Sequence, residues 1–182
     1  MDPWKSDDVV KFKRVFQEDF KQVEKALYQP LAEWIGNNLP GIIYLDPGEL
    51  GIDIIVSTND LIGFEVKMAR PFKGNIDASA LFQGIGQAIW YLRRGMDYSY
   101  LVVPLLADLP YFTEIFSKAT KYLGLIVFDK NLEFQKIREA EKNPSPDYSA
   151  KKVTLELLAK HRSVQANLML RKTKDKWRSS SQ

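Results

Sequence analysis

Two short apolar segments joined by a polar turn stand out in the hydrophobic pattern, at residues 52–57 and 61–68. Both alternate with a period of two, which predicts β-strands because successive side chains of a strand point to opposite faces. The alternation places Asp53, Glu65 and Lys67 within strands that are otherwise as apolar as buried ones. The pattern therefore predicts a hairpin whose second strand carries Glu65 and Lys67 on one face.

The turn fixes the register of this hairpin. A loop of residues 58–60 has a common hairpin length, and its Asn and Asp residues tolerate positive φ. In that register Asp53 lies opposite Glu65. A slip by one residue would mix the apolar and polar faces, so the pattern favours this pairing. The facing apolar pairs are Ile52 with Val66, Ile54 with Phe64 and Val56 with Ile62.

Two opposed carboxylates need a compensating cation. Directly opposed residues have Cβ atoms roughly 5 Å apart, and like charges there are destabilising. The ammonium of Lys67 is one candidate, and a divalent metal is another, because carboxylate oxygens suit Mg²⁺ and Mn²⁺. Charged residues on a hairpin face ordinarily form a solvated surface with a salt bridge. The apolar flanks favour a functional site over that alternative.

The rest of the chain predicts helices alternating with strands. Residues 6–38 predict a helix with Ser6 as its N-cap, in which Pro30 must cause a kink or begin a second helix. The apolar stripe of this helix comprises Phe16, Phe20, Val23, Leu27, Leu31 and Trp34. Residues 77–94 predict a helix with a buried stripe of Leu81, Ile85, Ala88, Ile89 and Leu92. Further strands are expected at 42–45, 99–106, 125–128 and 132–137, and a further helix at 110–123.

The C-terminal part has a different character. Residues 143–147, with two prolines, predict a linker, so we expect a domain of residues 1–142 and an extension of residues 143–182. A helix is expected at 150–172, which could pack on the domain, pair with a second subunit or lie on nucleic acid. Residues 177–182 are expected to be disordered.

Composition restricts the chemistry that the chain can perform. It has no cysteine and one histidine, His161, which excludes thiolate zinc sites, disulfides and cysteine nucleophiles and disfavours multi-histidine metal sites. A metal ion would therefore be held mainly by oxygen. The start of the chain has no apolar core for a signal peptide, and the longest uncharged apolar run, 98–107, is about half as long as a membrane span. We expect a soluble, intracellular (cytoplasmic) protein without a membrane partner.

The net charge of +3 conceals an asymmetry. Residues 150–182 contain nine Lys or Arg against Glu156 and Asp175, a net charge of +7, so the remainder of the chain carries −4. A basic block of this kind attracts polyanions, although many basic tails are only solvated ends.

One pattern resembles a known family. Asp53, a spacer of eleven residues and then Glu65-Val66-Lys67 are similar to the active-site signature of the PD-(D/E)xK nuclease superfamily, although Ile52 stands where many members have proline. Gln87 and Tyr91 match the Gln-x-x-x-Tyr motif that follows this strand in the RecB-type branch. The chain resembles this branch and the archaeal resolvase-like branch of the superfamily. The resemblance implies an α/β restriction-endonuclease-like fold, a mixed sheet flanked by helices with an αβββαβ core, here with a C-terminal helical extension.

The resemblance also implies roles for individual residues. Asp53, Glu65 and the backbone carbonyl of Val66 would hold Mg²⁺ or Mn²⁺, and Lys67 would orient water or neutralise developing charge. Gln87 and Tyr91 would fix the substrate strand or a metal-bound water. Glu24, on the first helix, would add a metal ligand or orient water; the alternative is an ordinary surface glutamate.

The activity that these roles imply is metal-dependent hydrolysis of DNA, possible contexts being recombination, repair or replication. The basic segment 68–75, which contains Arg70 and Lys73, has no clear periodicity and is expected to form a mobile loop that contacts DNA phosphates. A generic exposed loop is the alternative. Arg93 and Arg94 are expected to contact DNA phosphates as well. A homodimer is also implied. Two other functions stay open: a binding module that keeps the fold without cutting, and an enzyme acting on another phosphorylated substrate.

Overall fold

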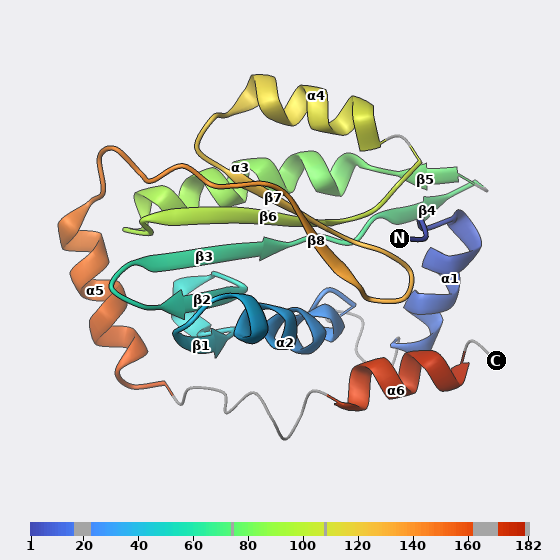
Figure 1. Ribbon diagram of the computed structural model, residues 1–182, viewed down its shortest axis with the longest axis horizontal. Helices are drawn as coiled ribbons and strands as arrows, with labels where there is room; N and C mark the ends of the chain where they lie inside the picture. The colour runs from blue at the N-terminus through green and yellow to red at the C-terminus, as the bar shows by residue number, and fades with distance from the viewer. Residues whose placement is uncertain (17–22, 74, 108, 162–170, 181–182) are drawn as a thin grey trace.

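The molecule is an α/β protein built on a mixed six-stranded sheet with the strand order β1-β2-β3-β6-β7-β8 (Figure 1). The computed structural model describes residues 1–16, 23–73, 75–107, 109–161 and 171–180. The strands are β1 (Ile42–Leu45), β2 (Ile54–Ser57), β3 (Leu61–Val66), β6 (Tyr98–Pro104), β7 (Gly124–Phe128) and β8 (Phe134–Arg138), with β4 (Arg70–Phe72) and β5 (Asn75–Asp77) forming a separate pair. The helices are α1 (Ser6–Val15), α2 (Tyr28–Asn38), α3 (Ser79–Arg93), α4 (Leu109–Ala119), α5 (Tyr148–Leu158) and α6 (Arg171–Ser180), with 3-10 turns η1 (Lys25–Leu27) and η2 (Gly48–Leu50).

The central hairpin has the register expected from its turn. Residues 58–60 connect β2 to β3, and the antiparallel pairs include Ile54 with Phe64 and Val56 with Ile62. β3 then pairs in parallel with β6, and α3 forms the crossover between them. The parallel pairing places the carboxyl ends of β3 and β6 at the same edge of the sheet.

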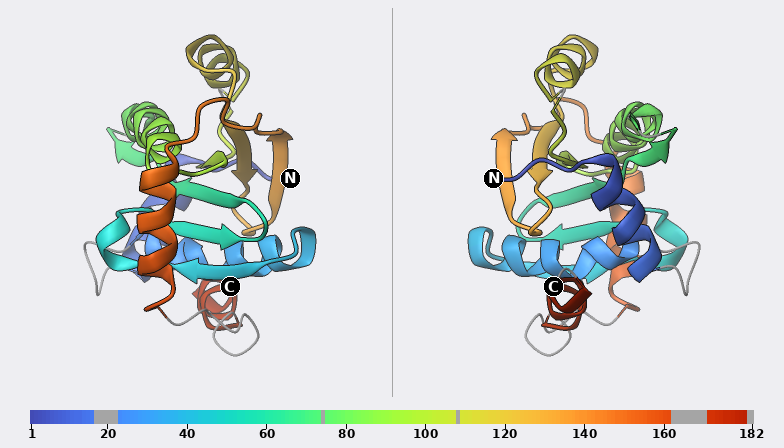
Figure 2. Two further views of the ribbon diagram at one scale, coloured as in Figure 1. Left: turned by 90° about the vertical axis from the view of Figure 1, so that its left-hand side faces the viewer. Right: turned by 90° about the vertical axis from the view of Figure 1, so that its right-hand side faces the viewer.

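Helices cover both faces of the sheet, which Figure 2 shows end-on. The even-numbered residues of β3, such as Phe64, pack with α1 and α2 in the main core. The opposite face of β6 and β7 packs against α3 and α4 in a second core. Glu65, an odd-numbered residue of β3, therefore faces the side of the sheet on which α3 lies.

The expected position of Ile52 is wrong. The sequence pairs it with Val66 on the main-core face, but Ile52 is buried in a third cluster with Leu50 and Ile55. Gly51 adopts a left-handed conformation with φ of 60° immediately before it, and β2 begins only at Ile54. The chain therefore turns before the strand begins, and strand alternation does not extend back to Ile52.

The C-terminal extension is packed against the domain through α5. The ammonium of Lys151 lies 2.5 Å from Oδ2 of buried Asp97, which also accepts the Leu61 N–H at 2.7 Å. The Thr154 hydroxyl donates to the carbonyl of Arg94 at 3.1 Å. Of the predicted helix 150–172, residues 162–170 lie outside the described residues.

The expectation of disorder from residue 177 onward is wrong for residues 177–180. α6 continues to Ser180, and Trp177 is only 5 % exposed in the main core. Its ring stacks on Trp4 with centroids 5.9 Å apart, and its indole N–H donates to the Lys130 carbonyl at 2.7 Å. Trp177 thus packs a helix with an otherwise polar sequence against the main core.

Three smaller expectations also need correction. The segment 68–75, expected as a loop, contains β4 and part of β5, which pair with each other. The N-cap of α1 is Lys5 and not Ser6, and the backbone N–H of Lys5 donates a hydrogen bond to the Asp8 carboxylate at 3.0 Å. Ile89 is 37 % exposed, so it does not belong to the buried stripe of α3. Phe20, expected on the first helix, lies outside the described residues.

The predicted helix 6–38 is wrong as a helix broken only at Pro30, because α1 already ends at Val15, while the expected second helix is present and begins at Tyr28. Pro30 is the third residue of α2, so its missing N–H falls in the first turn, where a helix has no internal acceptor. No helix among the described residues is long and apolar enough to cross a membrane.

Candidate active site

The candidate site lies at the carboxyl end of β3. Glu65 is on β3, Lys67 directly follows it, and Asp53 directly precedes β2. Glu24 precedes η1, and Tyr91 comes from α3. The antiparallel pairing of β2 with β3 is what brings Asp53 beside Glu65.

Glu65 is a buried carboxylate with a shifted pKa. Its side chain is 1 % exposed, and the Tyr91 hydroxyl donates to Oε2. The Lys67 ammonium lies 2.6 Å from Oε1, yet this buried atom accepts no well-aligned hydrogen bond from any described residue. Burial, with the charge of Asp53, raises the Glu65 pKa to about 7, although Lys67 and Tyr91 act in the opposite direction.

Asp53 is held by two donors. The Tyr28 hydroxyl donates to Oδ1, and the Val66 N–H donates to Oδ2 at 2.7 Å. Burial raises the pKa of Asp53, while these two hydrogen bonds and Lys67 oppose the rise. The Val66 contact fixes the carboxylate against the backbone of β3, beside Glu65.

Lys67 connects the acidic groups. Its ammonium is 2.6 Å from Glu65 and 3.7 Å from Oε2 of Glu24. Burial lowers the pKa of Lys67, but Glu65, Glu24 and Asp53 outweigh burial, so the pKa lies above its ordinary value. The lysine is therefore charged at neutral pH.

The stem of Lys67 lies against α3 at Gly84. A Cβ atom built on Gly84 would be 2.7 Å from Cγ of Lys67 and 2.7 Å from Cδ1 of Leu101. A side chain at position 84 would therefore occupy the space that the lysine uses. The glycine allows α3 to approach the sheet closely beside the site.

Glu24 lies on the solvent side of the cluster. Its side chain is 36 % exposed, and Oε1 accepts the Met68 N–H at 3.2 Å. This contact joins the segment before α2 to the chain that leaves β3. Glu24 is therefore not on the first helix, as expected, but in a turn before η1, from which its carboxylate still lies 3.7 Å from the Lys67 ammonium.

Tyr28 is the site residue that the sequence pattern did not indicate. It lies four residues after Glu24, at the start of α2, and the predicted apolar stripe of this helix contains Leu31 and Trp34 but not Tyr28. Burial and the charge of Asp53 raise the Tyr28 pKa, and burial with the charges of Asp53 and Glu65 raises that of Tyr91. Both hydroxyls therefore stay protonated and act as donors to the carboxylates. The spacing from Glu24, about one helical turn, was the available signal.

The remaining predicted residues are not gathered here. Gln87 is exposed on α3, and no hydrogen bond joins its side chain to the described residues of the cluster. Arg70 and Lys73 are exposed on or beside β4. Arg93 and Arg94 end α3 on the side of α5, whereas α3 begins beside β5 (Figure 1), and the guanidinium of Arg94 lies over the Trp90 ring at 4.2 Å.

The donor atoms of the site suit a hard divalent cation. Among the described residues, no three or more His, Cys, Asp or Glu side chains are gathered closely enough to hold a metal ion by themselves. Asp53, Glu65 and the Val66 carbonyl make a smaller set, all oxygen, which is the chemistry of Mg²⁺ and Mn²⁺ sites completed by water. The buried Oε1 of Glu65 has the Lys67 ammonium 2.6 Å away but no well-aligned hydrogen bond, so it has room for a further ligand.

Comparisons with known proteins add no assignment. No protein-family model matches the chain, and neither the curated proteins nor the solved structures compared with it gave a match. The candidate function therefore depends on the geometry of the cluster and on the sequence pattern.

Proposed function

We propose that this chain is a Mg²⁺- or Mn²⁺-dependent nuclease that hydrolyses DNA phosphodiester bonds on a restriction-endonuclease-like αβββαβ core. The observation that carries the proposal is the buried Glu65 carboxylate, held beside Asp53 and Lys67 at the carboxyl end of β3. Ligands of α/β sheets bind outside the carboxyl ends of the strands. The order of α2, the β1–β3 meander, α3, β6, α4 and β7 supports the same fold.

Asp53, Glu65 and the carbonyl of Val66 would hold the metal. When bound, such a metal polarises the scissile phosphate and lowers the pKa of a coordinated water. Tyr28 and Tyr91 keep the two carboxylates in place by hydrogen bonds to Oδ1 and Oε2. Carboxylates fixed in this way lose little freedom when a cation binds.

Lys67 supplies a fixed positive charge to the phosphate. The three carboxylates raise its pKa, so the ammonium is protonated at the pH at which the enzyme would work. Its contact with Glu65 orients it, and Gly84 confines its stem. A preorganised cation of this kind stabilises charge that develops on the phosphate oxygens.

One observation favours a second candidate, a nucleic-acid-binding or protein-interaction module that keeps the fold without cutting. Every carboxylate oxygen of Asp53 and Glu65 already has a protein donor or ammonium next to it. A cluster that is internally satisfied can be purely structural. Binding by the basic C-terminal part alone would then survive the loss of Glu65.

Cleavage of labelled DNA separates the two candidates. We expect Mg²⁺- or Mn²⁺-dependent products from a panel of linear duplex, single-stranded, flapped and four-way-junction DNA, and their pattern identifies the preferred substrate. Asp53→Asn and Lys67→Met should abolish cleavage, while Lys118→Met, at an exposed lysine of α4, should cleave like the parent. If the two site variants cleave as well as the parent, the proposal is wrong. A small phosphodiester assayed in parallel tests for a non-nucleic-acid substrate, and light scattering tests the homodimer, which stays a prediction.

A further inference from the structure

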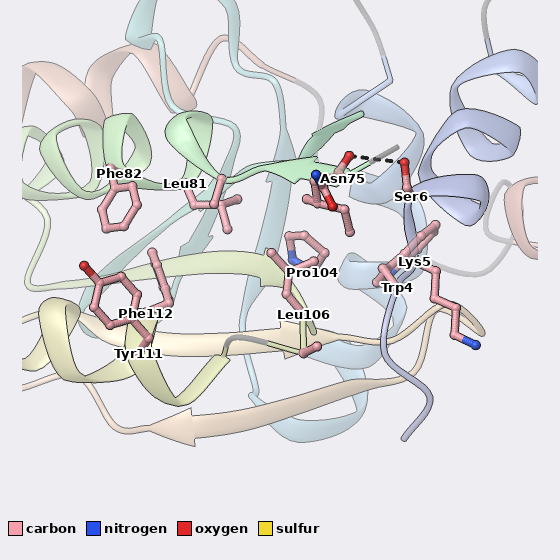
Figure 3. A pocket seen from close by; sticks show the side chains of 13 residues that line it. Trp4, Lys5, Ser6, Asn75, Leu81, Phe82, Pro104, Leu106, Tyr111 and Phe112 are labelled. Atoms are coloured by element: carbon pink, nitrogen blue, oxygen red, sulfur yellow. Dashed lines mark hydrogen bonds between the residues drawn. The ribbon is translucent and has the colours of Figure 1, made fainter. Parts of the chain in front are cut away.

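A pocket of about 500 Å³ opens at the same edge of the sheet as the candidate site. Its walls come from the N-terminal residues, from β5 and from the first turns of α3 and α4 (Figure 3). The volume lies within the range of small-molecule sites, roughly 300–1,000 Å³. None of the residues assigned above to metal or catalysis lines it.

The pocket is adjacent to the phosphodiester site along α3. Leu81 lines the pocket, and Gly84, one helical turn further along α3, contacts the stem of Lys67. Pro104, the last residue of β6, forms part of the floor, and β6 is the strand next to β3. The pocket and the stem of Lys67 therefore contact α3 about one helical turn apart.

The two sides of the pocket differ in chemistry. Figure 3 shows the aromatic side chains of α3 and α4 on one side and the polar side chains of residues 5, 6 and 75 on the other. Tyr111 is 66 % exposed and Phe82 is 39 % exposed, although both line the cavity. Phe82 packs on Phe112 with ring centroids 5.5 Å apart, which holds the aromatic side in place.

The polar side offers groups that recognise a nucleotide. The Ser6 hydroxyl donates to the Asn75 backbone carbonyl at 3.1 Å, which fixes β5 against the N-terminal segment. The Asn75 carboxamide is exposed at the rim and can donate to and accept from the edge of a base. The ammonium of exposed Lys5 adds a positive charge suited to a phosphate.

We infer that this pocket receives one unpaired nucleobase of the DNA substrate, stacked on Tyr111, with the phosphate of that nucleotide near Lys5. The inference rests on the proposed nuclease function and narrows its substrate to DNA with a frayed, overhanging or single-stranded segment beside the cut. An apolar peptide side chain would use the aromatic side alone. The combination of an aromatic platform, an amide and an ammonium in one pocket favours the base.

Binding without divalent metal tests the inference separately from cleavage. Fluorescence anisotropy would compare hairpin DNAs that carry a short thymidine overhang, at the 3′ or the 5′ end, with the same hairpins whose overhang is abasic. For the overhang end, 3′ or 5′, that fits the pocket, we expect the parent protein to bind the thymidine overhang about ten-fold more tightly than the abasic one. This is the size of one base-stacking interaction. Tyr111→Ala should lose this preference.

Tyr148→Ala is the matched control, because Tyr148 is a 75 % exposed tyrosine in the first turn of α5. It should keep the full preference. If Tyr111→Ala discriminates between the overhangs as the parent does, or if the parent itself does not discriminate, the inference is overturned. Cleavage by Asp53→Asn tests the nuclease proposal alone, so a failure of the pocket inference can be told apart from a failure of the nuclease function.

Discussion

At the scale of single residues, Glu65 is held by an ammonium and a tyrosine hydroxyl in a buried position. An ionised carboxylate that is 1 % exposed loses its hydration, and a second carboxylate, Asp53, lies beside it. Lys67 and Tyr91 offset part of this cost, and the pKa nevertheless rises to about 7. A site arranged for folding alone would gain by replacing this carboxylate, which is the physical reason to associate it with function.

The raised pKa of Glu65 predicts how stability changes with pH in metal-free protein. The folded state binds this proton more tightly than the unfolded chain, so the stabilisation is complete below the ordinary pKa of 4.5 and is lost as pH rises through about 7. Glu65→Gln should therefore be more stable than the parent at alkaline pH, by about 1–2 kcal/mol. The Glu65 pKa shift alone corresponds to roughly 3 kcal/mol. The gain in stability is smaller because the Lys67 ammonium loses the Glu65 carboxylate as its partner.

Urea unfolding at a series of pH values, in the presence of a chelator, measures this difference. Glu24→Gln is the control, since Glu24 is 36 % exposed and 3.7 Å from Lys67, and its effect should be small. A Glu65→Gln protein less stable than the parent at alkaline pH would show that Glu65 stabilises the fold.

The two tyrosines predict separate effects on the two carboxylates. Tyr91→Phe removes the hydroxyl that donates to Glu65, so the pKa of Glu65 should rise by about one pH unit, the worth of a hydrogen bond to a charged group. Tyr28→Phe should raise the pKa of Asp53 in the same way. Carbon NMR of the side-chain carboxyls follows each titration without requiring activity. A Tyr91→Phe protein with an unchanged Glu65 titration contradicts the hydrogen bond.

The residues that could be predicted from sequence are those in regular strands. Strand alternation and one turn were enough to predict the β2–β3 register, which brings Asp53 beside Glu65, because a slip of register would bury the wrong face. Tyr28 escaped prediction because a helical tyrosine beside an apolar stripe has no distinctive pattern. Gln87 matched a motif, yet it is exposed, because a spacing along a helix does not fix which way the side chain turns.

At the scale of elements, α3 is the wall that confines Lys67. Gly84→Ala should push the lysine stem or Leu101 away, since the new Cβ would be 2.7 Å from each. We expect a fall in kcat of about ten-fold or more, since small misplacements of catalytic groups are costly. Gly86→Ala is a matched control on the same helix, because nothing lies within 4 Å of its added Cβ.

The pair of glycine variants separates helix stability from the site. Gly86→Ala should raise stability by about 0.5–1 kcal/mol, the ordinary gain of alanine over glycine in a helix, and leave cleavage unchanged. Thermal unfolding and single-turnover cleavage measure the two properties. Equal cleavage rates for the two variants would mean that the position of Lys67 does not limit catalysis.

Elements with strong periodicity were predictable, and short ones were not. β2, β3 and α3 follow clear periods, β6 and β7 are continuous apolar runs, and their bounds came close to those expected. β4 and β5 have three residues each, which is too short for a period to be recognised. Their pairing depends on contacts across the chain, such as that of Ser6 with the Asn75 carbonyl, which no local pattern contains.

At the scale of the whole molecule, the basic C-terminal part is structural as well as charged. Lys151 pairs with buried Asp97, and Leu158 packs in the cluster of Leu50 and Tyr91. Trp177 then fills the main core from the other end of the chain. Deleting residues 150–182 would therefore disturb the folded domain, and lost DNA binding after such a deletion would say nothing about the charges.

Point substitutions on α6 separate the two roles. Trp177→Ala should destabilise the protein by about 3–5 kcal/mol, because a side chain that is 5 % exposed leaves a cavity against Trp4 and Phe12. Arg178→Gln removes an exposed charge on the same helix and should change stability by less than about 0.5 kcal/mol.

If α6 contacts DNA phosphates, as its charge suggests, Arg178→Gln should also weaken binding and lower the salt dependence by about one counterion. Urea unfolding and anisotropy at several salt concentrations give both numbers for each variant. An unchanged salt dependence in Arg178→Gln would mean that α6 only stabilises the core. The DNA contacts would then be assigned to the edge that carries Arg70 and Lys73.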